Sequence, residues 1–436
     1  MNGIGMEEHK LSKTSSTMFL DGVRGFASLS VFAHHFAQQY QHHVSYGYDG
    51  DNHTSLFRLP ILRVTYSGGP MVAIFFVVSG YALSHATLVL RKARAWEQIL
   101  KGVSSSVFRR GLRLFLPAII ASFATVVLVQ TNIYNFKFDH DARDPVASLL
   151  VQFPTFWEQV LDWIQFIFMV LLAPWPAYAE EARFSYNTNL WTIPLEFQSS
   201  MILYVTIVGL SRTPTVSRRI FLLVLSLYSM WQGGWCTFLF FQGMLLADVD
   251  LERRSTKARN HMVLGESVEE HHDTQGETES TIMLPIWVLN LLAGLYVASF
   301  PRLDANMTPA YRWLVSVTDS YRIWCAIGAV MILWSISRIQ VLRNIFTYSF
   351  FQYVGKVSYS LYLVQGPFLQ SCGFYVTPLL WKVIGRNSNV AYQTSFVLGF
   401  LIVCPLTLWA ADIFWRLVDR PCIAAARIMS QTLLVD

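Results

Sequence analysis

Residues 19–36 read FLDGVRGFASLSVFAHHF, an apolar stretch that contains four ionisable side chains. A transmembrane helix needs about 20 mostly apolar residues, so this stretch and its neighbours predict a membrane span over residues 18–38. Aspartate, arginine and histidine are rare inside a span unless they serve a function. The first apolar segment therefore indicates both an integral membrane protein and a functional site within it.

The whole chain has the composition of a membrane protein. Of its 436 residues, 53% are hydrophobic and 14% are charged, whereas soluble domains carry roughly 25% charged residues. These proportions exclude a set of soluble domains, a disordered chain, a coiled coil and a disulfide scaffold. The net charge of +5 is typical of basic cytoplasmic loops, so no nucleic-acid partner is expected. The five cysteines form no CxxC pair, which predicts buried thiols rather than ligands.

Hydropathy and loop charge together predict an all-α polytopic protein with about ten transmembrane helices. The expected spans are residues 18–38, 66–90, 112–130, 189–210, 219–233, 235–249, 283–300, 322–338, 350–371 and 393–415. The apolar stretch 158–177 is broken by Pro174 and Pro176. If it does not cross the membrane, the basic loops fall on the cytoplasmic side, as the positive-inside rule requires.

This scheme gives the chain a simple organisation. Residues 1–17 form a cytoplasmic tail, 18–421 form the transmembrane domain, and 422–436 form a second cytoplasmic tail. The N-terminal residues are polar, and no cleavable signal peptide is evident. A long segment from about residue 131 to 188 lies on the outer side.

Two polar features lie between the spans. The sequons at Asn52 and Asn306 fall on outer loops and predict N-glycosylation. The stretch 250–281 is rich in glutamate and predicts a flexible cytoplasmic loop. Its His271-His272 pair is interpreted as solvated, so no metal site is expected.

The ionisable residues of the first span are arranged by the helical repeat. Asp21 and Arg24 are three residues apart and can pair on one face. Arg24 and His35 are eleven residues apart, close to three turns, so they share a face at a separation of about 16 Å, whereas His34 is rotated by roughly 100°. A catalytic line of Asp21, Arg24 and His35 is one interpretation; a structural ion pair with an interfacial histidine is the other.

Two further charged segments border spans. Arg109, Arg110 and Arg113 open the third span at the cytoplasmic surface, where guanidinium groups could bind phosphates or simply anchor the helix among lipid headgroups. Glu196 follows Trp191 and Pro194 at the expected outer mouth of the fourth span. In apolar surroundings this carboxylate needs a partner, whether a substrate hydroxyl, a cation or a histidine.

These segments together resemble the membrane-bound acyltransferase 3 family, multi-pass enzymes that O-acylate sugars and small molecules. The resemblance runs in order along nearly the whole chain. It rests on Arg24-x10-His35 and on the segments LDGVRG (20–25), FFVVSGY (75–81), RGLR before Pro117 (110–113), LWTIPLEF (190–197), SYSLYL (358–363) and DRP (419–421). The late signature of the family often continues to a histidine, where this chain has Gln365. The insertion 250–281 is not part of the family pattern.

The resemblance implies a fungal stand-alone member that transfers an acyl group, expected to be acetyl, from acyl-CoA to a hydroxyl. Acyl-CoA is then a co-substrate, and no bound cofactor is expected. His35 would act as general base, since a neutral imidazole suits proton abstraction near pH 7. Arg24, Asp21 and Glu196 would complete the catalytic group, and Arg109, Arg110 and Arg113 would hold the CoA phosphates. A covalent acyl-histidine and direct transfer are both open.

Other functions remain as alternatives. A proton-coupled secondary transporter would use Arg24, His35 and Glu196 as a relay. A receptor or scaffold gives no reason for an arginine and a histidine on one buried face. Within the enzyme class, the acceptor is expected to be a hydroxylated secondary metabolite, with a cell-surface glycan as the alternative. The expected location is an endomembrane (ER or Golgi) or the plasma membrane.

Overall fold

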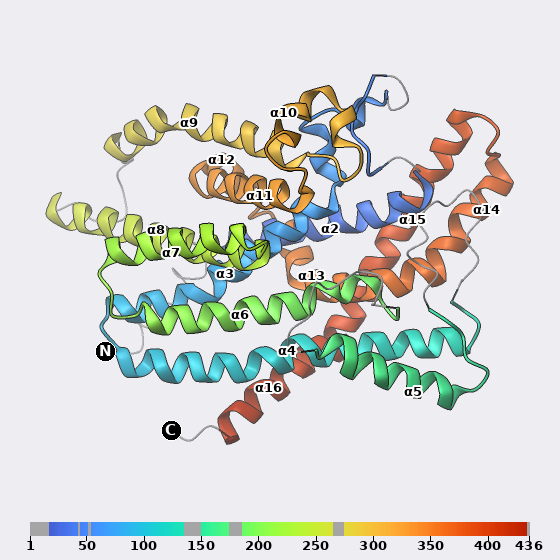
Figure 1. Cartoon of the computed structure of the whole chain (residues 1–436), viewed down its shortest axis with the longest axis horizontal. Helices are drawn as coiled ribbons and strands as arrows, with labels where there is room; N and C mark the ends of the chain where they lie inside the picture. Colours follow the sequence, from blue (N-terminus) through green and yellow to red (C-terminus); the bar gives the residue numbers. More distant parts are fainter. Residues whose placement is uncertain are drawn as a thin grey trace. The chain divides into compact units, whose positions relative to one another are not determined.

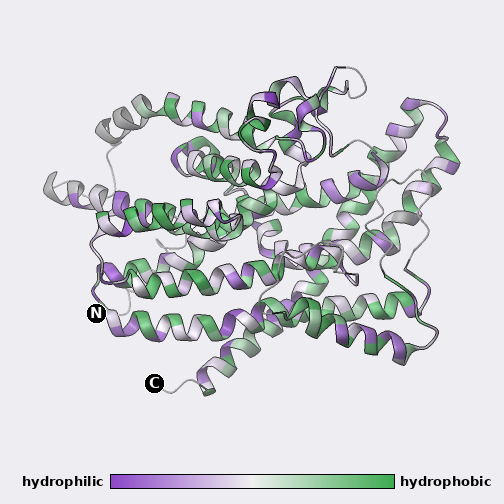
Figure 2. Cartoon of the chain, viewed as in Figure 1, coloured by the Kyte–Doolittle hydropathy of each residue, from purple (hydrophilic) through white to green (hydrophobic). Residues whose placement is uncertain are grey.

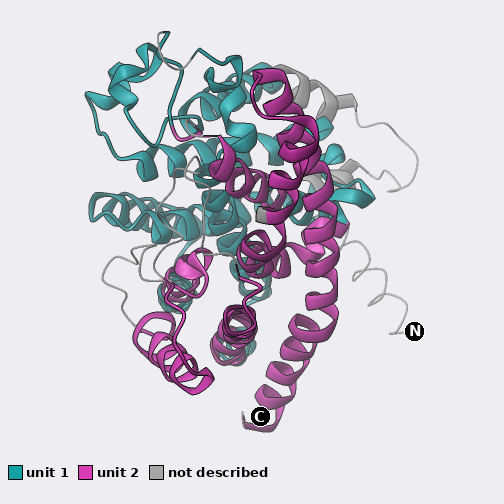
Figure 3. Cartoon of the chain, turned by 90° about the vertical axis from the view of Figure 1, so that its right-hand side faces the viewer, with its two compact units in different colours: residues 1–27, 46–103, 199–352 teal, residues 28–45, 104–198, 353–436 magenta. Residues whose placement is uncertain are grey.

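The computed structural model describes residues 17–41, 44–50, 54–134, 150–173, 185–264 and 274–433. In these ranges the chain is helical, apart from one isolated parallel β-bridge between Tyr46 and Leu303. The chain divides into two compact units (Figure 3). Unit 1 contains residues 1–27, 46–103 and 199–352, and unit 2 contains residues 28–45, 104–198 and 353–436. Helices α2, α4, α6 and α13 each contribute to both units.

Each of the ten predicted spans contains a helix (Figure 1). In chain order these helices are α2 (Met18–Tyr40), α3 (Gly68–Lys92), α4 (Trp96–Gln130), α6 (Thr192–Gly209), α7 (Thr215–Trp231), α8 (Trp235–Leu264), α9 (Thr274–Ala298), α11 (Tyr321–Arg338), α13 (Ser349–Phe368) and α15 (Asn389–Phe414). The stretch 158–177 contains most of α5 (Phe156–Phe166) and the π-turn η4 (Ile167–Leu171). The other helices are the short α10 (Arg312–Val315) and α12 (Gln340–Ile345), and α14 (Phe374–Ile384) and α16 (Arg420–Leu433).

Fewer helices are long and apolar enough to cross a membrane than the ten that were expected. Among the described residues three qualify: α3, α4 and the run from α15 through α16, Asn389–Leu433. The other predicted spans fall in helices that are shorter, such as the 17-residue α7, or that carry polar residues, such as α2. Figure 2 shows the hydrophobic residues of these helices in green.

Unit 1 is organised around α8, which packs against α3, α7 and α11, and α9 packs against α11. Small residues allow α3 and α8 to approach closely. A Cβ added to Gly80 would lie 2.3 Å from the Phe240 carbonyl oxygen, and one added to Gly243 would lie 2.2 Å from the Val77 carbonyl oxygen. These glycines explain part of the FFVVSGY segment, since small residues permit close packing of membrane helices.

The start of α2 also packs within unit 1. A Cβ added to Gly22 would lie 1.8 Å from the carbonyl oxygen of Phe346, so only glycine fits at this position of the LDGVRG segment. Phe26 contacts the rings of Phe346 and Phe351 edge-on, at centroid distances of 6.1 and 6.4 Å.

Unit 2 contains two apolar clusters. The first joins α4, α5, η4 and the segment before α6, with Ala118, Phe166 and Leu190 at its centre. The second joins the later part of α2 to the C-terminal helices, where Phe32 and Phe36 pack near Leu369. Helices α14 and α15 lie side by side in unit 2 (Figure 1).

Local sequence explains where several of these helices begin and end. Gly385 ends α14 with a φ of 93°, and the Ser388 side chain caps α15 by accepting from the Ala391 amide. Thr155 and Glu158 form a capping box that starts α5.

One sequence prediction about a polar segment changes. The predicted loop 250–281 is largely helical, because α8 continues to Leu264 and α9 begins at Thr274; Asp250 pairs with Arg338 at 3.1 Å, which fixes the first residue of the stretch. The predicted tail 422–436 lies mostly in α16. Asn52 and His271-His272 lie outside the described residues, whereas Asn306 is exposed in a 3₁₀ turn.

Candidate active site

Helix α2 carries the two histidines, and its buried face distinguishes them. Phe32, Phe36 and Tyr40 recur every four residues and pack into the second apolar cluster of unit 2. At about 100° per residue, His35 flanks this face and His34 lies almost opposite it. Both imidazoles are half-buried, with ring centroids 5.8 Å apart. The two histidines are thus both half-buried, and it is their angular position on α2 that distinguishes them.

Arg24 and Asp21 lie in the part of α2 that belongs to unit 1. Their side chains pair, with Nη1 of Arg24 3.6 Å from Oδ1 of Asp21, as the spacing of three residues predicts. The pair is not deeply buried, because the side chains are 30% and 59% exposed. An exposed ion pair of this kind contributes at most about 1 kcal/mol to stability.

The strongest polar contact among the predicted site residues joins Arg110 to Glu196 in unit 2. Nη2 of Arg110 donates to Oε1 of Glu196 at 2.5 Å, and the side chains are 10% and 22% exposed. Such a charge-assisted hydrogen bond is short and strong. The prediction that Glu196 needs a partner is thus met by Arg110, a residue 86 positions away.

This ion pair corrects the predicted placement of its two residues. A cytoplasmic Arg110 and an outer Glu196 would be separated by a hydrocarbon core about 30 Å thick, which a 2.5 Å contact excludes. Helix α4 begins at Trp96, so Arg110 is its fifteenth residue (110 − 96 + 1) and lies well inside the helix. The predicted third span, residues 112–130, lies within α4, and the more polar turns before it are also helical.

The three arginines of α4 have different surroundings. Arg110 is almost buried against Glu196, whereas Arg113 is exposed. Arg109 is half-buried, and its Nε donates to the Ser105 carbonyl of its own helix at 3.1 Å. They are therefore not equivalent candidates for binding a phosphate.

Packing around the ion pair fixes α4 against the start of α6. Phe115 and Phe197 meet edge-on with centroids 5.2 Å apart, and a Cβ added to Gly111 would contact the Phe197 ring at 3.6 Å. Both contacts lie on the C-terminal side of Arg110 in α4, and the side chains of the pair are only 10% and 22% exposed. Partial exclusion of water strengthens the attraction between Arg110 and Glu196.

Helix α13 is tied to this region by hydrogen bonds from two tyrosines. The Tyr359 hydroxyl donates to the Leu114 carbonyl at 2.5 Å, in the turn of α4 that precedes Pro117. A backbone carbonyl oxygen has two lone pairs, so the Leu114 carbonyl can accept this bond in addition to one within its helix. The Tyr362 hydroxyl lies 2.6 Å from the hydroxyl of Thr192. The SYSLYL segment thus connects α4 and α6 to α13.

The segment before α6 supplies a further contact. Nδ2 of Asn187 donates to the Leu363 carbonyl at 2.8 Å, and its Oδ1 accepts from the Asn189 amide at 3.1 Å. Nearby, the Tyr186 hydroxyl donates to Asp162 at 2.6 Å. Burial raises the pKa of Tyr186, and the bond to Asp162 raises this pKa further, so the hydroxyl stays protonated as a donor.

Gln365 follows this region of α13 and has unusual surroundings. The residue is 1% exposed, and neither its Oε1 nor its Nε2 forms a hydrogen bond with the described residues. The backbone at Gly366 passes so close to Asn187 that an added Cβ would lie 2.8 Å from Asn187 Oδ1. A buried amide without partners is costly, which suggests that Gln365 has a role other than stabilising the fold.

Comparison with known proteins places this geometry in a family. Residues 18–416 match the acyltransferase 3 family, described as an acyltransferase domain. This chain belongs to the acyltransferase 3 family. It is therefore an enzyme that transfers acyl groups, within a family of membrane-embedded proteins. No solved structure matches the chain.

Related acyltransferases of the family are found in fungi. The chain is 29% identical to the O-acetyltransferase PaAT-1 of Phomopsis amygdali, over 96% of this chain and 85% of the relative. It is 27% identical to the acyltransferase R4 of a Phoma species, over 93% and 94% of the two chains. It is 25% identical to the acyltransferase clz18 of Cochliobolus lunatus, again over 93% and 94%.

Sequence reasoning about this acyltransferase missed two residues of the candidate site. Asn187 precedes the LWTIPLEF segment and carried no motif of its own; the asparagine before a short helical turn was its only signal. Gln365 was noticed only as a departure from the family histidine. Its buried, unpaired amide becomes evident only in the folded chain.

Proposed function

We propose that this chain is an O-acetyltransferase that moves an acetyl group from acetyl-CoA to a hydroxyl of a small molecule made by secondary metabolism. The observation that carries the proposal is the nearly buried Arg110–Glu196 pair within the arginine and glutamate segments of the acyltransferase 3 family. Its similarity to an O-acetyltransferase over 96% of its length supports the choice of acetyl.

His35 is proposed as the general base that removes the proton of the acceptor hydroxyl. A hydroxyl is a weak nucleophile, and a positioned imidazole typically accelerates its attack by about 10²–10⁴-fold. Attack on the thioester carbonyl forms the new ester bond, breaks the carbon–sulfur bond and releases the CoA thiolate, which takes up the proton. Arg24 and Asp21, on the same helix, are proposed to set the electrostatic field around the site.

Arg113 and Arg109 are the proposed contacts of the CoA phosphates. The exposure of Arg113 supports this role, because a guanidinium fork can then reach a phosphate in solution. Arg110 is proposed to hold Glu196 in place and to add its positive charge to the attraction for the CoA phosphates. Glu196 in turn would orient the reacting groups and would not contact acetyl-CoA.

The proposed membrane arrangement has ten spans with both termini in the cytoplasm, in an endomembrane or the plasma membrane. The helices found at all ten predicted spans support it. Acetylation of a cell-surface glycan is the alternative reaction. Family membership favours an enzyme over the proton-coupled transporter that the charges in α2 also suggested.

The proposed function can be tested in membranes that contain the protein. Acetyl-CoA labelled in its acetyl group is added with a small-molecule extract or with a cell-wall glycan fraction, and labelled esters are identified by mass spectrometry. Label in a small-molecule ester, absent from membranes without the protein, would support the proposal. Label in the glycan alone would favour the alternative acceptor, and no label in either would contradict acetyl transfer.

A further inference from the structure

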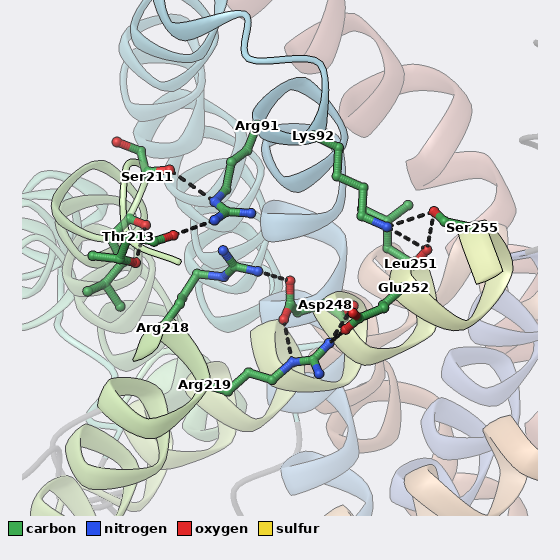
Figure 4. A network of polar contacts seen from close by, with 11 residues as sticks. Arg91, Lys92, Ser211, Thr213, Arg218, Arg219, Asp248, Leu251, Glu252 and Ser255 are labelled. Carbon is green, nitrogen blue, oxygen red and sulfur yellow. Dashed lines mark hydrogen bonds and ion pairs between the residues drawn. The ribbon is translucent and has the colours of Figure 1, made fainter. Parts of the chain in front are cut away.

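A network of charged residues in unit 1 contains none of the candidate active-site residues (Figure 4). Asp248 of α8 is 3% exposed and accepts from two arginines of α7. One is Arg218, through Nη2, and the other is Arg219, whose Nε is 2.7 Å from Oδ2. Arg219 also pairs with Glu252, one turn further along α8.

The end of α3 brings two more cations to this network. Nε of Arg91 donates to the Ser211 carbonyl at 3.0 Å, and Nη2 donates to the Thr213 carbonyl. Nζ of Lys92 donates to the Leu251 carbonyl at 2.9 Å and to the Ser255 hydroxyl at 2.7 Å. These partners are neutral, so the network joins four cations (Arg91, Lys92, Arg218 and Arg219) to two carboxylates (Asp248 and Glu252), an excess of two positive charges.

Arg218 has two guanidinium nitrogens without a partner. The residue is 1% exposed, and its Nε and Nη1 form no hydrogen bond with the described part of the chain. Figure 4 shows the guanidinium groups of Arg91 and Arg218 facing each other, and the positive charge of Arg218 acts on Arg91. Arg218 already pairs with Asp248, but its unused buried donors beside a second cation are unfavourable unless a further anion accepts from them.

The start of α7 adds to the positive potential at this point. Its N-cap is Pro214, which provides no side-chain cap for the first amides. The first turn of a 17-residue helix carries the positive end of the helix dipole and favours anions. Arg91 binds the Thr213 carbonyl immediately before this turn, so its guanidinium lies beside the helix start.

We infer that Arg91, Arg218 and the first turn of α7 form a binding site for a phosphate group. Guanidinium forks match the geometry of phosphate oxygens. A phosphomonoester carries a charge of about −1.5 to −2 at neutral pH, which matches the excess of two cations. The phosphate can come from an anionic phospholipid headgroup or from CoA, and only the CoA source rests on the proposed function.

Binding can be measured on the full-length protein in lipid nanodiscs. In one arm, CoA and 3′-dephospho-CoA are titrated against protein in phosphatidylcholine discs. In the other arm, phosphatidic acid is titrated into the discs. Arg91→Gln and Arg218→Gln are compared with Arg219→Gln, a matched control that also loses a contact with Asp248 but leaves the proposed site intact.

The site predicts that Arg91→Gln and Arg218→Gln raise the dissociation constant of one of these probes at least about 10-fold, as expected for a lost charge-assisted contact. Arg219→Gln is expected to change it less than about twofold. If CoA binds more tightly than 3′-dephospho-CoA and these variants abolish that difference, the bound phosphate is the 3′-phosphate of CoA. If the variants weaken the binding of phosphatidic acid, the bound phosphate belongs to a lipid headgroup. Arg91 is only half-buried, so its variant remains informative if Arg218→Gln does not fold.

The inference is overturned if neither probe depends on Arg91, or if Arg219→Gln weakens binding as much as the other variants. Acetyl transfer by the unmodified protein is measured separately. A failure of this phosphate site therefore leaves that activity intact, whereas an absence of acetyl transfer leaves the phosphatidic acid arm unaffected.

Discussion

Gln365 occupies a position in α13 where a leucine of similar size would be more stable. Its amide is buried and has no partner in the described chain, and removing such a group avoids a desolvation cost of about 1–3 kcal/mol. We therefore predict that Gln365→Leu raises the unfolding temperature while acetyl transfer falls at least about 10-fold, the effect of one lost hydrogen bond to substrate. Thermal unfolding and turnover of the same preparation test both effects. A variant with unchanged turnover would mean that Gln365 does not contact substrate.

The arginines of α4 are predicted to have separable effects. Arg113 is exposed, so Arg113→Ala should raise the KM for acetyl-CoA by about 10- to 150-fold, the range for a lost charge-assisted contact, with little change in stability. Arg113→Lys should restore part of this loss, because it keeps the charge but not the planar fork. Steady-state titrations of donor and acceptor give the two KM values. An unchanged donor KM would return Arg113 to the role of a headgroup anchor.

Arg110→Ala should behave differently, because it leaves Glu196 without its 2.5 Å partner. Removing one partner of a buried pair destabilises a protein by about 3–5 kcal/mol, and the partial exposure of this pair places it at the low end. The double variant Arg110→Met/Glu196→Leu should recover much of this stability, but not activity. Denaturant unfolding of the single and double variants checks this. Equal losses of stability in the single and the double variant would show that the contact between Arg110 and Glu196 does not stabilise the protein.

At the scale of single residues, the sequence predicted which groups carry charge inside the helices but not which groups meet. The need of Glu196 for a partner followed from its apolar neighbours. Arg110 could not be chosen as that partner, because hydropathy placed it at the other surface and 86 residues separate the two. The pairing of Asp21 with Arg24 was predictable because the spacing of a single helix determines it.

At the scale of elements, hydropathy located helices but not their full lengths. It placed the third span at residues 112–130, and α4 already begins at Trp96, because lysine, serine and arginine in the first turns lower the apolar average without preventing a helix. Helix α14 was not predicted, since its 11 residues are too few for a span. The polar stretch after residue 250 is helical for the same reason as the start of α4.

The contact between α3 and α8 gives a prediction at this scale. Gly80→Ala and Gly243→Ala would each force a methyl group against a backbone carbonyl, and overpacking of this kind costs about 1–3 kcal/mol. Gly102→Ala in α4 is the control, because nothing lies within 4 Å of the added methyl group, and alanine should stabilise this helix by up to about 1 kcal/mol. Thermal unfolding of the three variants should therefore give opposite signs. A destabilised Gly102→Ala would contradict the packing explanation.

At the scale of the whole molecule, the ten-span arrangement predicts which surfaces a reagent can reach. Arg212 precedes α7 and Asn306 lies in the 3₁₀ turn after α9; both are exposed. In sealed microsomes, a membrane-impermeant maleimide should label Arg212→Cys at once, but should label Asn306→Cys only after permeabilisation. Cys372→Ser is used as background, because Cys372 is the exposed native cysteine. Protection of Arg212→Cys in sealed microsomes would contradict the arrangement.

The family was predictable from sequence because several short segments occur in a fixed order along residues 20–421, whereas each alone has an ordinary explanation in packing or anchoring. The acceptor was not predictable in the same way. The surface that recognises the acceptor is assembled from distant segments, and no single segment contains a motif that identifies one substrate.

The most direct test of the account is the transfer of labelled acetyl from acetyl-CoA by the unmodified protein, His34→Ala and His35→Ala. His35 flanks the buried face of α2 and shares the face of Arg24, whereas His34 lies almost opposite that buried face. We predict a labelled ester with the unmodified protein, a loss of at least about 100-fold with His35→Ala, and a much smaller loss with His34→Ala. Full activity of His35→Ala at normal membrane abundance, or a greater loss with His34→Ala, would contradict it.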